Sequence, residues 1–244
     1  MDGSTMRMII CTLLIWSAAL ATASNEDLVT HIDPVEWKKW EWRADRAEKQ
    51  LSKGQWAKAD KAARSLGRDI IDGSRLGHQI EPLLARVSAI RAVSFAMRGK
   101  TRLARWHWQL AQILTSKPPE IDLSLFDSRI AYLRDVKPRG PDERPNAALG
   151  WEEAGKPEPQ ALKTPMPIYS KSASRVGIQA RMTVNVIIRE DGKLSGPFVY
   201  DKGDLAVFYY PILLALADWE FEPLVVDDHP VAFVYILTVR FKMS

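Results

Sequence analysis

The residue types that most often perform catalysis or bind metals are few in this sequence, and their spacing matches no catalytic arrangement. The four histidines, His31, His78, His107 and His229, include no pair at the H-x-x-x-H or H-E-x-x-H spacing of a zinc site. Asp227-Asp228-His229 suggests a carboxylate–histidine pair, but its composition favours a turn between two elements. The sequence also lacks a G-x-S-x-G nucleophile motif and a phosphate-binding loop. We therefore expect no enzyme, no metal site and no cofactor.

Export to a bacterial periplasm is predicted by the N-terminus. Arg7 precedes an apolar run from Met8 to Ala21 of roughly 14 residues, shorter than the about 20 residues that span a bilayer. The small residues of Ala21-Thr22-Ala23 suit a signal peptidase. We expect residues 1–23 to form a cleaved signal peptide. The alternative is a short membrane anchor that leaves the protein in the inner membrane, facing the periplasm.

The only cysteine, Cys11, lies inside this apolar run. Cleavage after Ala23 would leave a mature chain without a thiol, which excludes disulfides, cysteine-ligated metals and thiol catalysis. Membrane association is expected only through this N-terminal segment.

Composition and charge indicate a folded protein of two modest domains. The chain has 244 residues, of which 46% are hydrophobic and 26% charged, enough to bury two cores. The net charge is +4, and acidic residues are interspersed among the basic ones without a dense basic block. We therefore expect no nucleic-acid partner.

Apolar residues at helical spacing predict an all-α region over residues 33–135. Asp33 followed by Pro34 marks the start of the first helix, and a fifth helix is expected over about 122–135. The expected core positions of the five helices are Trp40, Ala44, Ala47 and Leu51; Trp56, Ala59, Ala63, Leu66 and Ile70; Ile80, Leu84, Val87, Ile90, Ser94 and Met97; Leu103, Trp106, Leu110 and Ile113; and Leu123, Phe126, Ile130 and Leu133.

Two of the expected joints between helices have similar sequences. Gly54 and Gly99 each open a tight turn, and Ala59 and Ala104 follow five residues later, where a small side chain lets two helices approach closely. The region therefore resembles a tetratricopeptide-repeat array, with an insertion around residues 68–79. An ordinary bundle of four or five helices is the alternative.

Residues 136–164 predict a linker. Proline recurs there among charged residues and glycines, and this density prevents both a helix and a central strand. We expect a semi-rigid spacer that extends by about 3.1 Å per residue.

Residues 165–244 predict a small α+β domain with a three-stranded antiparallel sheet packed by helices. Alternation from Arg181 to Arg189 indicates a strand, and Asp191-Gly192 supplies a hairpin turn. Gly196-Pro197 suggests a bulge in the returning strand.

A helix and a last strand complete the expected domain. Because proline is tolerated in the first turn of a helix, Pro211 predicts a helix from about Tyr210 to Asp218. The last strand is expected from Pro230 to Lys242.

These features together resemble the C-terminal domain of TonB-family energy transducers over roughly residues 165–243. The resemblance rests on Tyr169-x-x-x-Ala173-x-x-x-Gly177-Ile178, the hairpin, and Trp219-x-Phe221-x-Pro223 followed by Pro230-Val231. The sequence departs from the family pattern at Ser170, Ala180 and Pro211. Family transducers also have a full membrane anchor followed directly by a proline-rich spacer, whereas a helical region intervenes here.

The resemblance implies a periplasmic domain that captures an extended peptide of an outer-membrane receptor and supports energy-coupled transport across the outer membrane. A peptide strand would pair with the edge of the last strand, with selectivity from its alternate side chains. These residues are Val231, Phe233, Tyr235, Leu237 and Val239, and the core motif is Trp219, Phe221 and Pro223.

Two functions remain open at this point. The first is a TonB-like transducer, which would need an anchor and inner-membrane motor proteins as partners. The second is a soluble periplasmic adaptor that uses the helical repeats and the sheet edge for protein–protein interactions without energy transduction. A mature N-terminus at Ser24 would favour the adaptor, and an intact Met1 would favour the anchored transducer.

Overall fold

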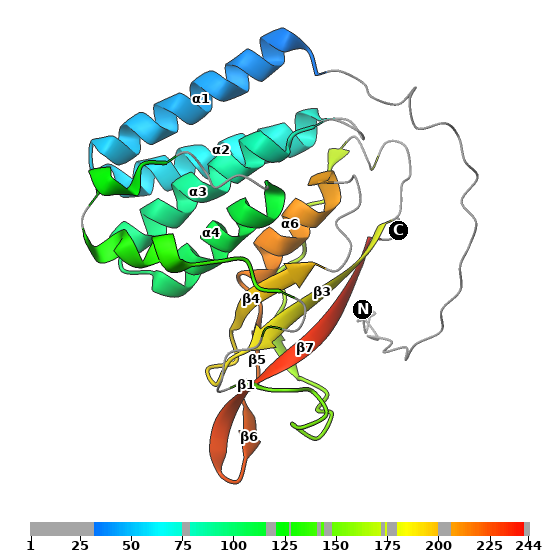
Figure 1. The fold of residues 1–244 in the computed structure, drawn as a ribbon. Coiled ribbons are helices and arrows are strands. Elements are labelled where there is room, and N and C mark those ends of the chain that lie inside the picture. Colours follow the sequence, from blue (N-terminus) through cyan, green and yellow to red (C-terminus); the bar gives the residue numbers. More distant parts are fainter. Residues whose placement is uncertain are drawn as a thin grey trace, which may run out of the picture.

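The computed structural model describes residues 32–74, 79–115, 121–126, 128–140, 143, 148–171, 174, 180–199 and 206–241. The expected signal peptide and the Ala173, Gly177 and Ile178 positions of the motif lie outside the described residues. Both regions expected from the sequence are present: helices form one end of the molecule and a twisted sheet forms the other (Figure 1).

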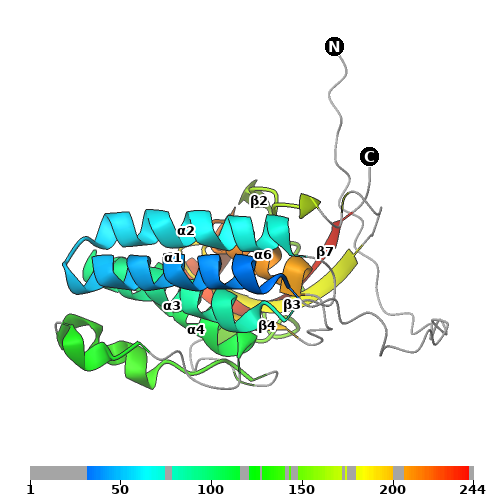
Figure 2. The same cartoon turned by 90° about the horizontal axis from the view of Figure 1, so that it is seen from above.

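Four long helices build the N-terminal region and lie side by side, as the view from above shows (Figure 2). The helical elements are α1 (Pro34–Ser52), α2 (Trp56–Gly73), α3 (Glu81–Met97), α4 (Thr101–Leu114), the 3₁₀ segments η2 (Leu123–Leu125) and η3 (Ser128–Asp135), and α6 (Ala206–Leu216). The start of α1 is as predicted, because the Asp33 side chain accepts a hydrogen bond from the Val35 N–H at 2.9 Å. Helix α3 is buried on nearly every face, so it forms the centre of the helical layer.

The two joints with similar sequences also have the same geometry. Gly54 and Gly99 both have a φ of 71°, in the left-handed region. In each joint the glycine N–H bonds to the carbonyl three residues back, and the next N–H bonds to the carbonyl five residues back. Ala59 and Ala104 are fully buried, as expected for close helix approach. The helical character and the matching joints agree with the repeat hypothesis, while the repeat assignment itself stays a prediction.

The expected fifth α-helix is wrong in type. Residues 122–135 form two 3₁₀ segments, η2 and η3. The buried pair Ile130 and Leu133 is three residues apart, which is the period that aligns side chains on a 3₁₀ helix. The apolar pattern therefore identified Leu123, Ile130 and Leu133 as buried positions, while Phe126 is only partly buried and the helix type is different.

The described residues form a main sheet, which contains the three expected strands, and a separate pair of short strands. The strands are β1 (Ala148–Leu149), β2 (Ala161–Lys163), β3 (Ala180–Ile188), β4 (Leu194–Val199), β5 (Glu220–Phe221), β6 (Leu224–Val226) and β7 (His229–Phe241). The main sheet has the order β1-β7-β3-β4, with β6 also paired to β7, and β2 pairs separately with β5. The register of β3 and β4 shifts opposite Gly196-Pro197, which confirms the predicted bulge.

Helix α6 starts earlier than predicted and contains its proline in the interior. Pro211 is the sixth residue of α6, not a residue of its first turn. An interior proline costs about 3 kcal/mol because it removes a backbone hydrogen bond and crowds the preceding turn. Every side chain from Ala206 to Leu213 is buried, and each large apolar side chain contributes about 1.5–3 kcal/mol on burial. The free energy gained by burying these side chains therefore outweighs the cost of the proline inside the helix.

Helix α6 lies between the helical layer and the sheet (Figure 1). The Trp106 indole N–H of α4 donates to the Leu213 carbonyl of α6 at 2.9 Å, and the Arg102 guanidinium donates to the Leu194 carbonyl of β4 at 3.1 Å. The buried side chains of α1–α4, α6 and the sheet form one continuous cluster. The two regions are thus packed directly on each other.

The segment expected as an extended spacer lies against the sheet instead. Its strand β1 pairs with β7 in parallel, and its strand β2 pairs with β5. A tight turn at residues 150–156 joins them, with the Trp151 indole N–H donating to the Pro157 carbonyl at 3.2 Å. Proline excludes long regular elements, but it does not prevent short strands at sheet edges. We call residues 136–140, 143 and 148–149 the docked segment.

Arg139 fixes the docked segment to the sheet. Its side chain is only 8% exposed, and it donates to the carbonyls of Gly196 at 2.7 Å, Asn185 at 3.0 Å and Glu143 at 2.9 Å. A side chain at Gly196 would lie within 3.3 Å of Arg139, so the glycine at the bulge lets the arginine approach. A long-range contact of this kind leaves no periodic signal in the sequence.

Replacing Arg139 is expected to destabilise the protein by about 2–3 kcal/mol, because Arg139→Met leaves buried carbonyls without donors. Urea denaturation measures this loss, and limited proteolysis shows whether residues 136–149 become accessible. Lys137→Met, at an exposed position two residues earlier, serves as the control and should change stability by less than about 0.5 kcal/mol. Equal stability of the two variants would contradict the anchoring role.

Candidate protein-binding edge of the sheet

Strand β7 is long and has different neighbours along its two edges. One edge pairs with β3 from Phe233 to Phe241. Strand β6 continues along this same edge over residues 229–231, and the other edge pairs with β1 over residues 232–233. Among the described residues, no strand pairs with this outer edge beyond that point. We call the outer side of residues 234–241 the exposed edge.

The turn between β3 and β4 sets which backbone groups point to the exposed edge. The Arg189 N–H donates to the Lys193 carbonyl of β4 at 3.0 Å, so the backbone groups of the preceding residue, Ile188, point the other way, toward β7. Ile188 lies opposite Phe233 in the unbroken register of β3 and β7, so Phe233 and every second residue after it bond to β3. The alternate residues, from Val234 to Arg240, direct their N–H and C=O groups toward the exposed edge. These groups could accept an added strand.

The five residues expected to give selectivity lie on the side of β7 that faces the core. Phe233 and Leu237 are buried in the main cluster, and Tyr235 and Val239 pack against it partly buried. Val231 lies in the paired part of the strand, opposite Leu224. Their backbone groups bond to β3 or β6, so a peptide added on the outer edge would pair with the alternate residues, and the part of these five in selectivity stays a prediction.

The opposite face of β7 presents the side chains that the sequence reasoning did not assign a role. Ile236 is 54% exposed, and Thr238 and Arg240 are exposed beside it. Arg181 of β3 lies directly opposite Arg240 in the register, and both side chains are exposed. The alternation of the strand contained this signal, because the residues between the five chosen positions must face away from the core.

Burial also affects the chemistry of the exposed edge. It raises the pKa of Tyr235, and the carboxylate of Glu158 raises it further. The Tyr235 hydroxyl therefore stays protonated well above neutral pH, where it is a neutral hydrogen-bonding group.

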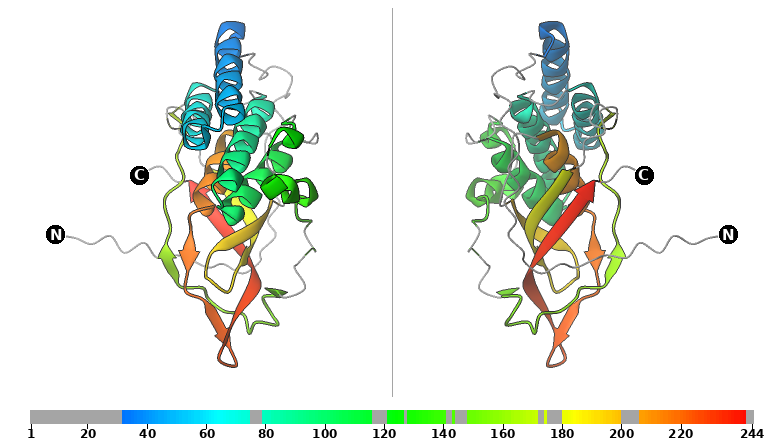
Figure 3. Two further views of the ribbon diagram at one scale, coloured as in Figure 1. Left: turned by 90° about the vertical axis from the view of Figure 1, so that its left-hand side faces the viewer. Right: turned by 90° about the vertical axis from the view of Figure 1, so that its right-hand side faces the viewer.

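Phe221 of the core motif is a buried residue. This side chain is 2% exposed and lies in the main cluster. Trp219 is partly buried, with its ring 6.1 Å from that of Phe221, and its indole N–H donates to the Pro165 carbonyl at 3.0 Å. Pro223 is exposed just before β6. The motif thus connects α6 to the β6–β7 hairpin, which projects at the end opposite the helices (Figure 3).

A cavity of about 720 Å³ lies between α4, the docked segment and the β3–β4 pair. Its wall includes Arg102, Arg105 and Lys137, but also the carboxylates of Glu143 and Glu190. Charges of both signs line it, so the cavity does not define one class of ligand.

Metal sites and membrane spans were searched in the described part of the chain. In that part, no three or more histidine, cysteine, aspartate or glutamate side chains gather closely enough to hold a metal ion. Over the same residues, no helix combines the length and the apolar character needed to cross a membrane.

Helix α6 and the sheet form an α+β domain with the exposed edge along β7. Residues 165–243 match the family model of the Gram-negative bacterial TonB protein C-terminal domain. Among solved structures, the chain is similar to the solution NMR structure of the Pseudomonas aeruginosa TonB C-terminal domain, with 28% identity and a TM-score of 0.31 over 35% of this chain and 86% of that one. No curated protein matches the chain. The C-terminal third of this protein therefore belongs to the TonB C-terminal domain family.

Proposed function

We propose that this protein is exported to the periplasm and binds an extended peptide of an outer-membrane or periplasmic partner through the exposed edge of β7. Membership of the C-terminal domain in the TonB family indicates a TonB-like role in energy-coupled transport. The observation that carries the proposed binding mode is the unpaired outer edge of residues 234–241 in the described structure.

The length of this edge suits strand addition. Val234, Ile236 and Thr238 point their backbone groups outward, so an added strand could form several backbone hydrogen bonds. Each such bond contributes about 0.5–1.5 kcal/mol net. Pairing of β3 on the other edge holds β7 extended beforehand, which reduces the entropy lost on binding.

Substitution of Ile236 by proline tests this proposal. Ile236→Pro removes an outward N–H without removing a β3 hydrogen bond, and Ile236→Ala removes the same side chain but keeps that N–H. We expect Ile236→Pro to weaken binding at least tenfold and Ile236→Ala to bind much more strongly. Interferometry with synthetic peptides copied from the plug segments of outer-membrane receptors of the same organism measures this difference.

The proline variant must remain folded for the test to hold, which circular dichroism checks. Equal binding by folded Ile236→Pro and Ile236→Ala would contradict strand addition at this edge.

A soluble adaptor remains the second candidate. The helical layer packs directly on the TonB-like domain through α6, so both would act as one body. Mass spectrometry of the protein purified separately from membrane and soluble fractions separates the two functions. A mature chain beginning at Ser24 would exclude direct coupling to a membrane motor, and an intact N-terminus in the membrane fraction would exclude the soluble adaptor.

A further inference from the structure

Three guanidinium groups converge on one carboxylate within the helical layer. Asp60 of α2 is 5% exposed. It accepts a hydrogen bond from Arg91 Nε at 2.9 Å, and Arg64 and Arg98 lie at 3.4 and 3.5 Å from its other oxygen. One negative charge therefore faces three positive charges.

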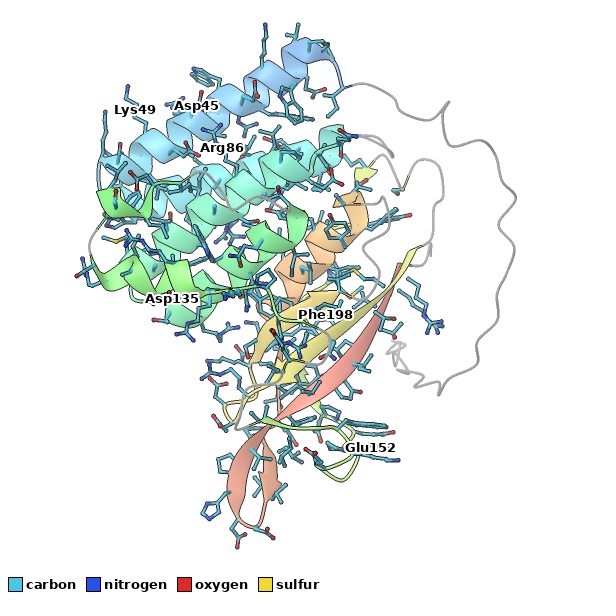
Figure 4. The ribbon with its side chains drawn as sticks, in the orientation of Figure 1. Asp45, Lys49, Arg86, Asp135, Glu152 and Phe198 are labelled. Carbon is cyan, nitrogen blue, oxygen red and sulfur yellow. The ribbon has the colours of Figure 1, made fainter. Side chains whose placement is uncertain are left out.

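Arg86 shows how the same protein neutralises an arginine elsewhere. Its guanidinium contacts Glu48 and Asp45, each at 2.6 Å, and Figure 4 shows Arg86 and Asp45 close to each other. At Arg86, two carboxylates surround one guanidinium. At Asp60 the ratio is reversed, so this part of the helical layer has an excess of positive charge.

The aromatic ring of Phe95 lies close to two of these arginines and to a lysine. Arg91, Arg98 and the Lys100 ammonium lie 5.4, 5.8 and 6.0 Å from the centre of the Phe95 ring. Cation–π attraction of this kind stabilises these positive charges less than a neighbouring anion would. The His107 ring also stacks on the Phe95 ring, with the two ring centres 5.3 Å apart. The buried Nδ1 atom of His107 has no hydrogen-bond partner. Burial holds the pKa of His107 well below 6.5, and nearby arginines lower it further.

The surrounding sequence supplies no further acidic residue. No aspartate or glutamate occurs between Glu81 and Glu120, a stretch that contains most of α3 and all of α4. Asp60 is likewise the only acidic residue from Trp56 to Arg68 of α2. The excess charge is thus a property of the place where these helices meet.

We propose that Arg64, Arg91, Arg98 and Lys100, here called the basic cluster, bind a phosphate group carried either by a lipid headgroup or by a small free phosphate compound. Guanidinium forks and an ammonium group match the oxygens of phosphate. The cluster has a buried and an accessible tier: the Arg91 side chain is 9% exposed, whereas those of Arg98 and Arg64 are 32% and 58% exposed. The exposed side chains of the basic cluster contact the phosphate, while Asp60 and Phe95 hold the buried Arg91 in place.

Binding assays with the full chain and two double variants test this site. Arg98→Gln/Lys100→Gln removes two exposed charges of the basic cluster, and Lys38→Gln/Lys39→Gln removes two exposed charges of α1 as the control. The probes are inorganic pyrophosphate, by calorimetry, and vesicles of phosphatidylglycerol with phosphatidylcholine, by co-sedimentation against pure phosphatidylcholine. The N-terminal apolar run is the same in all variants, so it contributes equally to every vesicle measurement.

We expect the wild type and the control variant to bind the probe. In the Arg98→Gln/Lys100→Gln variant the affinity should fall at least tenfold, and added salt should weaken binding by the wild type. Loss confined to pyrophosphate would identify a small free phosphate compound as the ligand, and loss on vesicles would identify a lipid headgroup. Absence of wild-type binding to both probes, or equal binding by the two double variants, would overturn the proposal.

Discussion

Gly192→Ala is expected to destabilise the TonB-like domain by about 3–4 kcal/mol. Gly192 has a φ of 73°, and a Cβ placed there would lie 1.9 Å from the Phe221 carbonyl oxygen. The two residues are already joined, because the Phe221 N–H donates to the Gly192 carbonyl at 2.9 Å. The turn cannot move away without breaking that bond, so left-handed strain and steric overlap add. Thermal and urea denaturation measure the loss.

Gly99→Ala separates these two contributions. Gly99 has nearly the same φ, 71°, but a Cβ there would meet no atom within 4 Å. It should therefore cost only about 1–2 kcal/mol, the penalty of a left-handed alanine. Similar losses for the two variants would show that the contact between the turn and Phe221 is not tight.

The sequence predicted best those features that depend on neighbours along the chain. All four core positions expected in α1, from Trp40 to Leu51, are buried. Both glycine joints adopt the expected turn, and the hairpin with its bulge is in place. Helical period, strand alternation and turn residues are local, so they can be interpreted without knowledge of the fold.

Features that depend on distant contacts could not be predicted in this way. Pro211 argued for a short helix, but burial between two layers stabilises the longer one. Prolines in residues 136–164 argued for a free spacer, whereas Arg139 and Ala148 join that segment to the sheet. The exposed edge itself is shorter than the strand, because β1 pairs with residues 232–233 on that side.

The grouping of charged side chains is another feature that depends on distant contacts and could not be predicted from the sequence. Along the sequence the basic residues are scattered, and no dense block is present. Packing of α2, α3 and α4 brings Arg64, Arg91 and Arg98 around Asp60, although these residues are spread over 39 positions. Only the fold shows that a single carboxylate holds them together.

Asp60→Asn is therefore expected to be among the most destabilising single substitutions in the helical layer, at about 3–5 kcal/mol. The substitution keeps the size of the side chain but leaves the nearly buried Arg91 without its carboxylate, 2.9 Å away. Breaking a buried pair exposes the remaining charge to its full desolvation penalty, and the repulsion among the three guanidinium groups is no longer offset. Urea denaturation in a buffer free of phosphate and sulfate measures the change, because an anion bound to the basic cluster would mask it.

Asp45→Asn is the matched control. Asp45 also contacts an arginine, Arg86, but its side chain is 63% exposed, and Arg86 has a second carboxylate partner, Glu48, at 2.6 Å, which the substitution leaves in place. Its loss should cost less than about 1 kcal/mol, as for exposed ion pairs. Equal and small effects of the two substitutions would mean that water, and not Asp60, compensates the charges of the cluster. A large effect of Asp60→Asn that added phosphate partly restores would tie the stability of the helical layer to occupation of the basic cluster by an anion.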